Sequence, residues 1–542
     1  MQFNLSMKRR SFVKNSVLTT LSVTLLPAVS CKFNSKADKA DKESPEGVDV
    51  TELTISEIQE KVKRGALTYV ALTQTYLKKI AELDETGPGL NSVIEINPDA
   101  LSLAEKMDQE YKAGNLRGPL HGIPILIKDN INSGDKMQTT AGSLALAGNI
   151  ATEDAFVVKK LREAGAVILG KTNLSEWANF RSTRSASGWS SRGGQTRNPY
   201  ILDRSPCGSS SGSAVAVSAN LCAVAVGTET DGSIACPASM NGVVGIKPTI
   251  GLVSRSGIIP ISITQDTAGP LARTVTDAAL LLNCMTGADA ADPVTTKNGD
   301  KKMDYSQYLD TSSLKGKRIG VEKTFLKHHE GIDKLLKQAL SQMEQAGATI
   351  VEVEFMAKTA EFGKAEFERL EFEFKDGLNK YLTASNSKIK SLKELIEFNL
   401  QNESSVMPWF KQEILESSEK KGDLASKEYL AANLQLEKLK TFIDQLFTSQ
   451  KLDALCGPAT GSAWCNDLVN GDFWTGYGTY TPAAITGYPS ITVPMGFVDS
   501  LPVGISFIGK PFAEPELIAI GYAYEQKSIN RKAPQFFSTL KV

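Results

Sequence analysis

Between residues 117 and 290, short apolar runs alternate with helical patterns and glycine-rich turns. Three of the apolar runs predict buried strands, at 123–127, 166–170 and 221–226. Three amphipathic patterns predict helices, at 154–163, 212–219 and 274–282. This alternation is typical of a mixed β-sheet core with helices on both faces, and we therefore expect an α/β fold.

Sequence on either side of this region adds to the same core. Thr54 and Glu57 have capping-box spacing, which predicts a helix that begins there and ends near Gly65, and a second helix is expected over 68–83. Residues 300–450 are poorer in glycine and richer in lysine and glutamate. We interpret 300–450 as a mainly helical insertion, or cap, with two strands of its own near 318–321 and 349–353.

From residue 452 the pattern of the core returns. Strands are predicted at 452–456, 490–493 and 503–508, and a closing helix at 514–526. We therefore expect residues 51–542 to form a single domain, interrupted by the helical insertion.

The N-terminus has the features of an export signal. Arg9 and Arg10 precede an apolar stretch over 16–29, as in twin-arginine signals, and the stretch is too short for a permanent membrane span. Residues 26–31 resemble a loose lipobox with Cys31 as the lipidated residue; an ordinary cleavage site there is the alternative. We expect a signal over 1–31, a flexible tether over 32–50, and a mature protein in the periplasm or anchored to the membrane facing it.

Composition excludes several kinds of site. A net charge of −1 gives no reason to expect nucleic acid as a partner. Seven cysteines without a CxxC pair and only three histidines argue against a metal site, and we expect no cofactor. Cys207, Cys222 and Cys236 lie in apolar or Gly/Ser-rich surroundings, so we expect small buried residues there rather than disulfide partners. Nothing in the sequence indicates the oligomeric state.

Two motif matches are set aside. Residues 165–172 fit the phosphate-loop pattern, but their middle is a predicted strand where that motif needs a loop. Residues 208–212 fit the G-x-S-x-G nucleophile elbow, but polar residues precede them instead of a buried strand. The later histidines, His328 and His329, lie in a Lys/Glu-rich segment. A histidine-based triad therefore has little support.

Lys128 is the candidate base. It ends an apolar strand, where burial disfavours the charged ammonium and lowers the pKa of the amine. The alternative is a structural lysine that reaches water or pairs with Asp129.

Two turns carry candidate nucleophiles. The Gly/Ser cluster around Ser209 opens a predicted helix, and an N-cap or anion-binding turn is its alternative role. Residues 227–233 follow a predicted strand, and Gly232 beside Ser233 permits a turn that aims backbone N–H groups at one point, as an oxyanion hole requires. A tight turn with buried polar side chains is the alternative.

Together these motifs resemble the amidase signature family over nearly the whole mature chain, most densely from Gly122 to Arg273. The resemblance implies a Ser-Ser-Lys triad in which Ser233 is the nucleophile and Ser209 bridges it to neutral Lys128. It also implies a cis peptide bond between Gly208 and Ser209. The implied oxyanion donors and supporting residues are the backbone N–H groups of Thr230, Asp231, Gly232 and Ser233, with Ser210, Thr228 and Glu229 around them.

Within that family, residues 241–270 look most similar to peptide amidases. The resemblance implies an exported amide hydrolase that works through an acyl-enzyme and removes the carboxamide from peptide C-termini or from related small amides. The alternatives are a glutamine amidase of the amidotransferase type, an aryl, lactam or fatty amidase, and a non-catalytic binding protein. Five aromatic residues either line a substrate pocket or pack as a satellite of the core: Trp464, Phe473, Trp474, Tyr477 and Tyr480.

Overall fold

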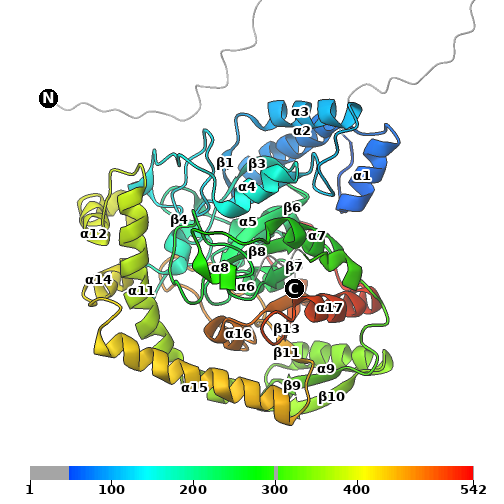
Figure 1. Cartoon of the computed structure of the whole chain (residues 1–542), viewed down its shortest axis with the longest axis vertical. Coiled ribbons are helices and arrows are strands. Elements are labelled where there is room, and N and C mark those ends of the chain that lie inside the picture. Colours follow the sequence, from blue (N-terminus) through cyan, green and yellow to red (C-terminus); the bar gives the residue numbers. More distant parts are fainter. Residues whose placement is uncertain (1–47, 298–302, 541–542) are drawn as a thin grey trace, which may run out of the picture. The chain divides into compact units, whose positions relative to one another are not determined.

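The computed structural model describes residues 48–297 and 303–540 (Figure 1). The chain divides into a unit of residues Met1–Glu46, none of which is described, and a unit of residues Gly47–Val542. The predicted export signal, the Cys31 lipidation site and nearly all of the predicted tether therefore lie outside the described residues. Within the described part, no helix is both long enough and apolar enough to cross a membrane.

One large sheet forms the centre of the second unit (Figure 1). It contains eleven strands in the order β1-β3-β2-β6-β8-β7-β12-β13-β11-β9-β10. In sequence order the strands are β1 Val93–Ile96, β2 Pro124–Lys128, β3 Val167–Thr172, β6 Val224–Glu229, β7 Val244–Lys247, β8 Thr267–Ala272, β9 Arg318–Glu322, β10 Thr349–Val353, β11 Ala454–Pro458, β12 Ser490–Val498 and β13 Leu501–Ile508. A separate hairpin pairs β4 (Trp189–Ser190) with β5 (Gly194–Gln195).

Strand directions in this sheet are mixed. β3, β2 and β6 run parallel, and so do β11, β9 and β10. The strands between these two groups pair antiparallel, from β6 through β8, β7, β12 and β13 to β11. Helices connect the parallel neighbours, as a crossover between parallel strands requires. The predicted mixed sheet is confirmed.

The helices of the first half of the chain are α1 Ile55–Lys63, α2 Tyr69–Lys79, α3 Ala100–Lys112, α4 Phe156–Glu163, α5 Ser211–Ser218, α6 Ala235–Met240, α7 Val275–Met285 and α8 Pro293–Lys297. Those of the second half are α9 Glu330–Gln345, α10 Met356–Ala360, α11 Gly363–Ala384, α12 Leu392–Gln401, α13 Glu403–Val406, α14 Glu413–Glu419, α15 Lys427–Ser449, α16 Thr481–Thr486 and α17 Glu514–Ser528. Short π or 3-10 turns are η1 Ile80–Glu85, η2 Leu144–Leu146, η3 Glu176–Asn179, η4 Tyr305–Tyr308 and η5 Lys323–Lys327.

Alternate side chains of β12 show that helices cover both faces of the sheet. Side chains of successive strand residues point to opposite faces. Ile491 and Val493 lie against α17 at Gly521, whereas Thr492 lies on the same side as Ser239 of α6. α6 and α17 therefore cover opposite faces, as the sequence predicted.

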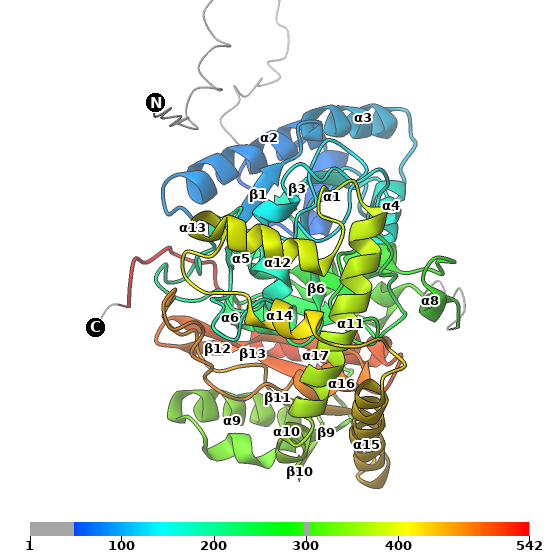
Figure 2. The same ribbon diagram turned by 90° about the vertical axis from the view of Figure 1, so that its left-hand side faces the viewer.

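The segment predicted as a helical insertion contributes to both the sheet and its surroundings. β9 and β10 extend the main sheet at its edge beyond β11. From residue 363 onward the segment is helical, and Figure 2 shows α11, α12 and α14 packed side by side. α11 also packs along α15. One end of α11 reaches the candidate site described below.

Candidate active site

Lys128 is the last residue of β2, and its side chain is fully buried. Its Nζ lies 2.7 Å from Ser209 Oγ, 2.8 Å from Thr228 Oγ1 and 3.0 Å from Ser210 Oγ. It neither reaches solvent nor pairs with Asp129, whose carboxylate binds Thr140 and Arg192. The alternative role considered for Lys128 is therefore wrong.

Burial lowers the pKa of Lys128. Loss of hydration lowers the pKa of its amine well below the usual value, and the negative charges of Asp266 and Glu229 oppose this shift without cancelling it. Two other lysines are buried as well: Lys171 donates to the carbonyl oxygen of Ile131 and to Thr139 Oγ1, and Lys247 donates to a carbonyl oxygen. Lys128 differs in that three hydroxyl groups surround its amine, in addition to the carbonyl oxygen of Thr228.

The turn that carries Ser209 bends through left-handed backbone at Cys207 and Gly208, with φ of +53° and +59°. No peptide bond of the described residues is cis, so the cis bond expected between Gly208 and Ser209 is absent. The two left-handed residues reverse the chain instead, and they direct the Ser209 N–H toward Ser233 Oγ at 3.2 Å. Ser209 Oγ faces Lys128 at the same time.

Ser210 fixes this turn to the sheet. Its hydroxyl accepts the Thr228 N–H at 3.0 Å and donates to the Thr228 carbonyl oxygen at 2.8 Å. The Ser210 N–H donates to the carbonyl oxygen of Ser233 at 3.2 Å. Ser210 and Thr228, both predicted to support the site, therefore contact Lys128, and Ser210 also contacts the backbone of Ser233.

Ser233 lies in the turn between β6 and α6. Gly232 has a φ of +81°, and a Cβ there would lie 2.4 Å from the ring of Tyr480, so only glycine fits. Glu229 holds the far side of the turn, since its Oε2 accepts the N–H groups of Ile234 and Ala235 at 2.7 and 2.9 Å. The side chain of Ser233 is mostly buried but borders a cavity.

The predicted oxyanion donors lie in this same turn. Within the described part of the chain, the N–H groups of Asp231, Gly232 and Ser233 donate to no other protein group. Thr230 is held by its side chain, whose hydroxyl donates to Asp266 Oδ1 at 2.5 Å. N–H groups beside a hydroxyl nucleophile can stabilise negative charge on a bound carbonyl oxygen.

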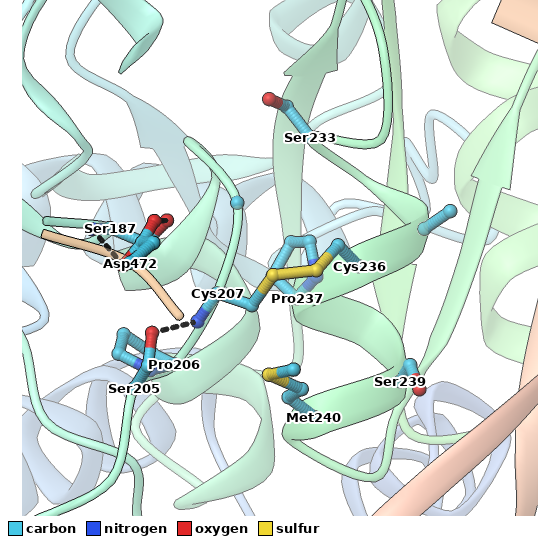
Figure 3. The surroundings of a disulfide bond; sticks show 12 residues. Ser187, Ser205, Pro206, Cys207, Ser233, Cys236, Pro237, Ser239, Met240 and Asp472 are labelled. Atoms are coloured by element: carbon cyan, nitrogen blue, oxygen red, sulfur yellow. Dashed lines mark hydrogen bonds between the residues drawn. A yellow bond between two sulfur atoms is a disulfide. The ribbon is translucent and has the colours of Figure 1, made fainter. Parts of the chain in front are cut away.

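A disulfide between Cys207 and Cys236 ties the two turns together (Figure 3). The expectation that these cysteines are unpaired is wrong, whereas Cys222 is free and buried as predicted. The pairing links the residue two before Ser209 to the first turn of α6, just after Ser233. Their separation of 29 residues hides this proximity in the sequence.

The cavity at Ser233 has a volume of about 360 Å³. Glu366, Phe367 and Leu370 of α11 form part of its wall, so the helical segment supplies part of the site. Three of the five predicted aromatic residues line it: Trp464, Trp474 and Tyr480. Of the others, Tyr477 packs against Phe325 in the core and Phe473 is 73% exposed.

Sequence reasoning missed three acidic residues at this site, namely Asp266, Glu366 and Asp472. Asp266 accepts a hydrogen bond from the Thr230 hydroxyl, and Glu366 lines the cavity together with Asp231, whose pKa it raises. Asp266 follows Gln265 in the 241–270 run that resembles peptide amidases, which was the available signal. The sequence held no such signal for Glu366, because it lies on a Lys/Glu-rich helix whose charged residues were expected to face solvent.

The arrangement has the parts needed for acyl transfer. A hydroxyl borders the cavity, N–H groups that donate to no other described protein group lie beside it, and a second hydroxyl contacts a lysine whose pKa is lowered by burial. Among the described residues, no group of three or more His, Cys, Asp or Glu side chains is placed to hold a metal ion.

Several known proteins are similar to this chain in sequence and in fold. The Amidase family model matches residues 71–518. A probable amidase of Arabidopsis thaliana is 42% identical over 503 residues, covering 90% of this chain and 92% of that protein. The solved structure of native peptide amidase from Stenotrophomonas maltophilia is 51% identical, with 90% of this chain and 99% of that chain covered and a TM-score of 0.86. A glutamyl-tRNA(Gln) amidotransferase component of Thermoanaerobacter pseudethanolicus is 32% identical over 521 residues, covering 90% of this chain and 99% of that protein.

Proposed function

Because this chain belongs to the amidase signature family and is a hydrolase of amide C–N bonds, we propose that its substrates are peptides with a C-terminal carboxamide. The observation that carries the proposal is the 51% identity to a peptide amidase over nearly the whole of that enzyme. The aromatic walls of the cavity suit the side chain of a C-terminal residue.

In the proposed mechanism, Ser233 is the nucleophile and Lys128 the base. Ser233 Oγ accepts the Ser209 N–H and keeps its own proton free to leave. That proton passes to Ser209 Oγ, while the Ser209 hydroxyl proton passes to neutral Lys128. Ser233 Oγ then bonds to the carboxamide carbon.

The N–H groups of Asp231, Gly232 and Ser233 stabilise the negative oxygen of the tetrahedral intermediate. Its collapse breaks the C–N bond, and the proton held by Lys128 returns through Ser209 to the departing ammonia. Water enters along the same path, gives its proton to the relay and attacks the acyl-enzyme. The products are a peptide carboxylate, an ammonium ion and free Ser233.

A glutamine amidase of the amidotransferase type is a weaker candidate. The solved glutamyl-tRNA(Gln) amidotransferase component from Thermotoga maritima is 28% identical with a TM-score of 0.67, compared with 51% and 0.86 for the peptide amidase. The amidotransferase interpretation requires ammonia to pass to a partner protein, whereas the peptide-amidase interpretation needs only the site described above.

Export is part of the proposal. Arg9, Arg10 and the following apolar stretch have the pattern of a twin-arginine signal, and Cys31 is the proposed lipid-bearing residue of a protein that faces the periplasm. The Cys207–Cys236 disulfide supports this location, because disulfides persist in oxidising compartments.

The proposed function is tested by incubating the purified chain with an N-acetylated dipeptide amide. Ammonia release is followed, and the product is identified by mass spectrometry as the free carboxylate. Glutamine, an anilide and an aliphatic amide serve as competing substrates. The proposal is contradicted if any of these has a higher kcat/KM than the peptide amide.

A further inference from the structure

The cavity at Ser233 is lined by acidic but not by basic side chains. Asp231, Glu366 and Asp472 are among its lining residues, and none of the described residues that line it is a lysine, an arginine or a histidine. All three carboxyl groups come from different parts of the chain: the turn before Ser233, helix α11 and the segment before α16. The cavity therefore has an excess of groups that can carry negative charge.

Asp231 and Glu366 form a carboxyl pair. The two side chains are hydrogen-bonded to each other, which requires a proton between them. Thr481 Oγ1 donates to Asp231 Oδ1 at 3.2 Å, and Gln265 Nε2 donates to Glu366 Oε1 at 2.8 Å. Each carboxyl thus also accepts from a neutral donor, and the pair places two acidic groups on the same part of the cavity wall.

The surroundings of the pair explain why it keeps that proton. Burial raises the pKa of both carboxyls, and the negative charges of Glu366 and Glu229 raise that of Asp231 further. The guanidinium of Arg369 donates to Gln265 Oε1, and its positive charge lowers the pKa of Glu366 in part while also acting on Glu373. Arg369 does not line the cavity, so none of the described residues places a cation on the cavity wall itself.

Asp472 adds a third carboxyl group to the cavity wall. Its Oδ1 accepts the Ser187 N–H at 3.0 Å and the Trp464 indole N–H at 3.1 Å, and its Oδ2 accepts the Ser187 hydroxyl at 2.5 Å. Although burial raises the pKa of this carboxyl, all three hydrogen bonds favour its charged form.

We propose that Asp231, Glu366 and Asp472 select substrates by charge, so that the cavity accepts amides of neutral or cationic C-terminal residues and disfavours those of acidic ones. The inference rests on the proposed function and specifies its substrate class. Like charges that face each other in a cavity repel, because protein replaces part of the water that would screen them. The same repulsion acts on the product, because hydrolysis turns a neutral carboxamide into a carboxylate beside Asp231, and it therefore favours product release.

Three substrates with unbranched side chains of similar length test the proposal: the N-acetyl amides of methionine, lysine and glutamate. At pH 8 we expect kcat/KM for the glutamate amide to be lower than for the methionine amide by roughly tenfold or more, with the lysine amide within about threefold of methionine. A purely apolar cavity would disfavour lysine as much as glutamate, and that result overturns the proposal. If none of the three amides is hydrolysed, the proposed function is contradicted instead.

Substitutions in the cavity wall test which carboxyl groups cause the discrimination against the glutamate amide. Asp231→Asn and Glu366→Gln alone each leave one ionisable carboxyl, so each is expected to keep the methionine-to-glutamate ratio within about twofold of the original. The double variant removes the charge of the pair and is expected to narrow the ratio by roughly threefold or more. Glu368→Gln, on the same helix but paired with Lys421 outside the cavity, is the matched control and leaves the ratio unchanged. An unchanged ratio in the double variant overturns the role of the pair.

A measurement on the unaltered protein covers the case in which the double variant does not fold. N-acetylmethionine ends in a carboxylate and N-acetylmethioninol in a neutral alcohol, and neither has the primary C-terminal carboxamide of the substrate. We expect the carboxylate to inhibit with a Ki higher by roughly tenfold or more than that of the alcohol. Equal inhibition overturns the proposal.

Discussion

The backbone N–H of Ser209 donates a hydrogen bond to Ser233 Oγ at 3.2 Å, although 24 residues separate the two serines in the chain. The same residue meets Lys128 through its hydroxyl at 2.7 Å. Ser209 therefore contacts the proposed nucleophile with its backbone and the proposed base with its side chain. Because the two contacts use different atoms of Ser209, substitutions can test the roles of Lys128, Ser209 and Ser233 one at a time.

Replacing Ser233 with alanine should remove the nucleophile, and kcat/KM for a peptide amide should fall by roughly 10⁴-fold or more. Ser209→Ala removes the relay hydroxyl but keeps the N–H that contacts Ser233, so a smaller loss of roughly 10²- to 10³-fold is expected. Steady-state ammonia release measures both. Ser341→Ala, on the exposed surface of α9, is the control and should retain full activity. Equal activity of Ser209→Ala and the parent would exclude Ser209 from the relay.

Lys128→Met should abolish activity and yet stabilise the fold at neutral pH. Lys128 has a lowered pKa in the folded protein, so the unfolded chain binds more protons between that pKa and 10.5. Stability linked to Lys128 is thus fully present above pH 10.5 and is lost as the pH falls toward the folded pKa. The Tm advantage of Lys128→Met should therefore be largest near pH 7 and shrink as the pH rises. Thermal unfolding from pH 7 to 10.5 measures it, with exposed Lys63→Met as a control that should show no such trend.

Removing the Cys207–Cys236 disulfide by a double substitution with serine should destabilise the protein. Closing a loop of 29 residues corresponds to about 3–4 kcal/mol in the chain-entropy account. Activity should also fall, because the bond fixes the turns that carry Ser209 and Ser233. Denaturant unfolding with and without a reductant measures the effect. Reductant should lower the free energy of unfolding of the parent to that of the double variant. The control Cys465→Ser removes a free cysteine, and reductant should lower its free energy of unfolding as much as that of the parent.

Gly232→Ala should damage catalysis beyond its cost in backbone strain. A Cβ at residue 232 would lie 2.4 Å from the ring of Tyr480 and would displace the turn that holds the oxyanion donors. We expect kcat to fall by roughly 10²-fold, comparable to the loss of an oxyanion donor. Gly114 has a similar φ of +78° with open space around its Cβ position. Gly114→Ala should therefore cost about 1 kcal/mol of stability and leave kcat unchanged. Similar kcat values for the two variants would rule out the contact with Tyr480 as the cause.

Local features of the fold were predictable where neighbouring residues determine them. The Thr54–Glu57 capping box forms as expected and starts α1 at Ile55. The strand predicted at 221–226 instead spans Val224–Glu229, because pairing with β8 extends it through polar residues that carry no apolar signal. Boundaries that depend on a partner strand are not encoded in the local pattern.

The sequence by itself determined the α/β class of the fold, the place of Lys128 at the end of a buried strand, and the turns that carry Ser209 and Ser233. Each of these follows from apolar periodicity or from glycine within a few residues. Only the tertiary structure decided the Cys207–Cys236 bond and the carboxyl pair of Asp231 and Glu366. Their physical reason is the same: both depend on distances between segments far apart in the chain, which are set by how the sheet and the helices pack and not by the residues next to them.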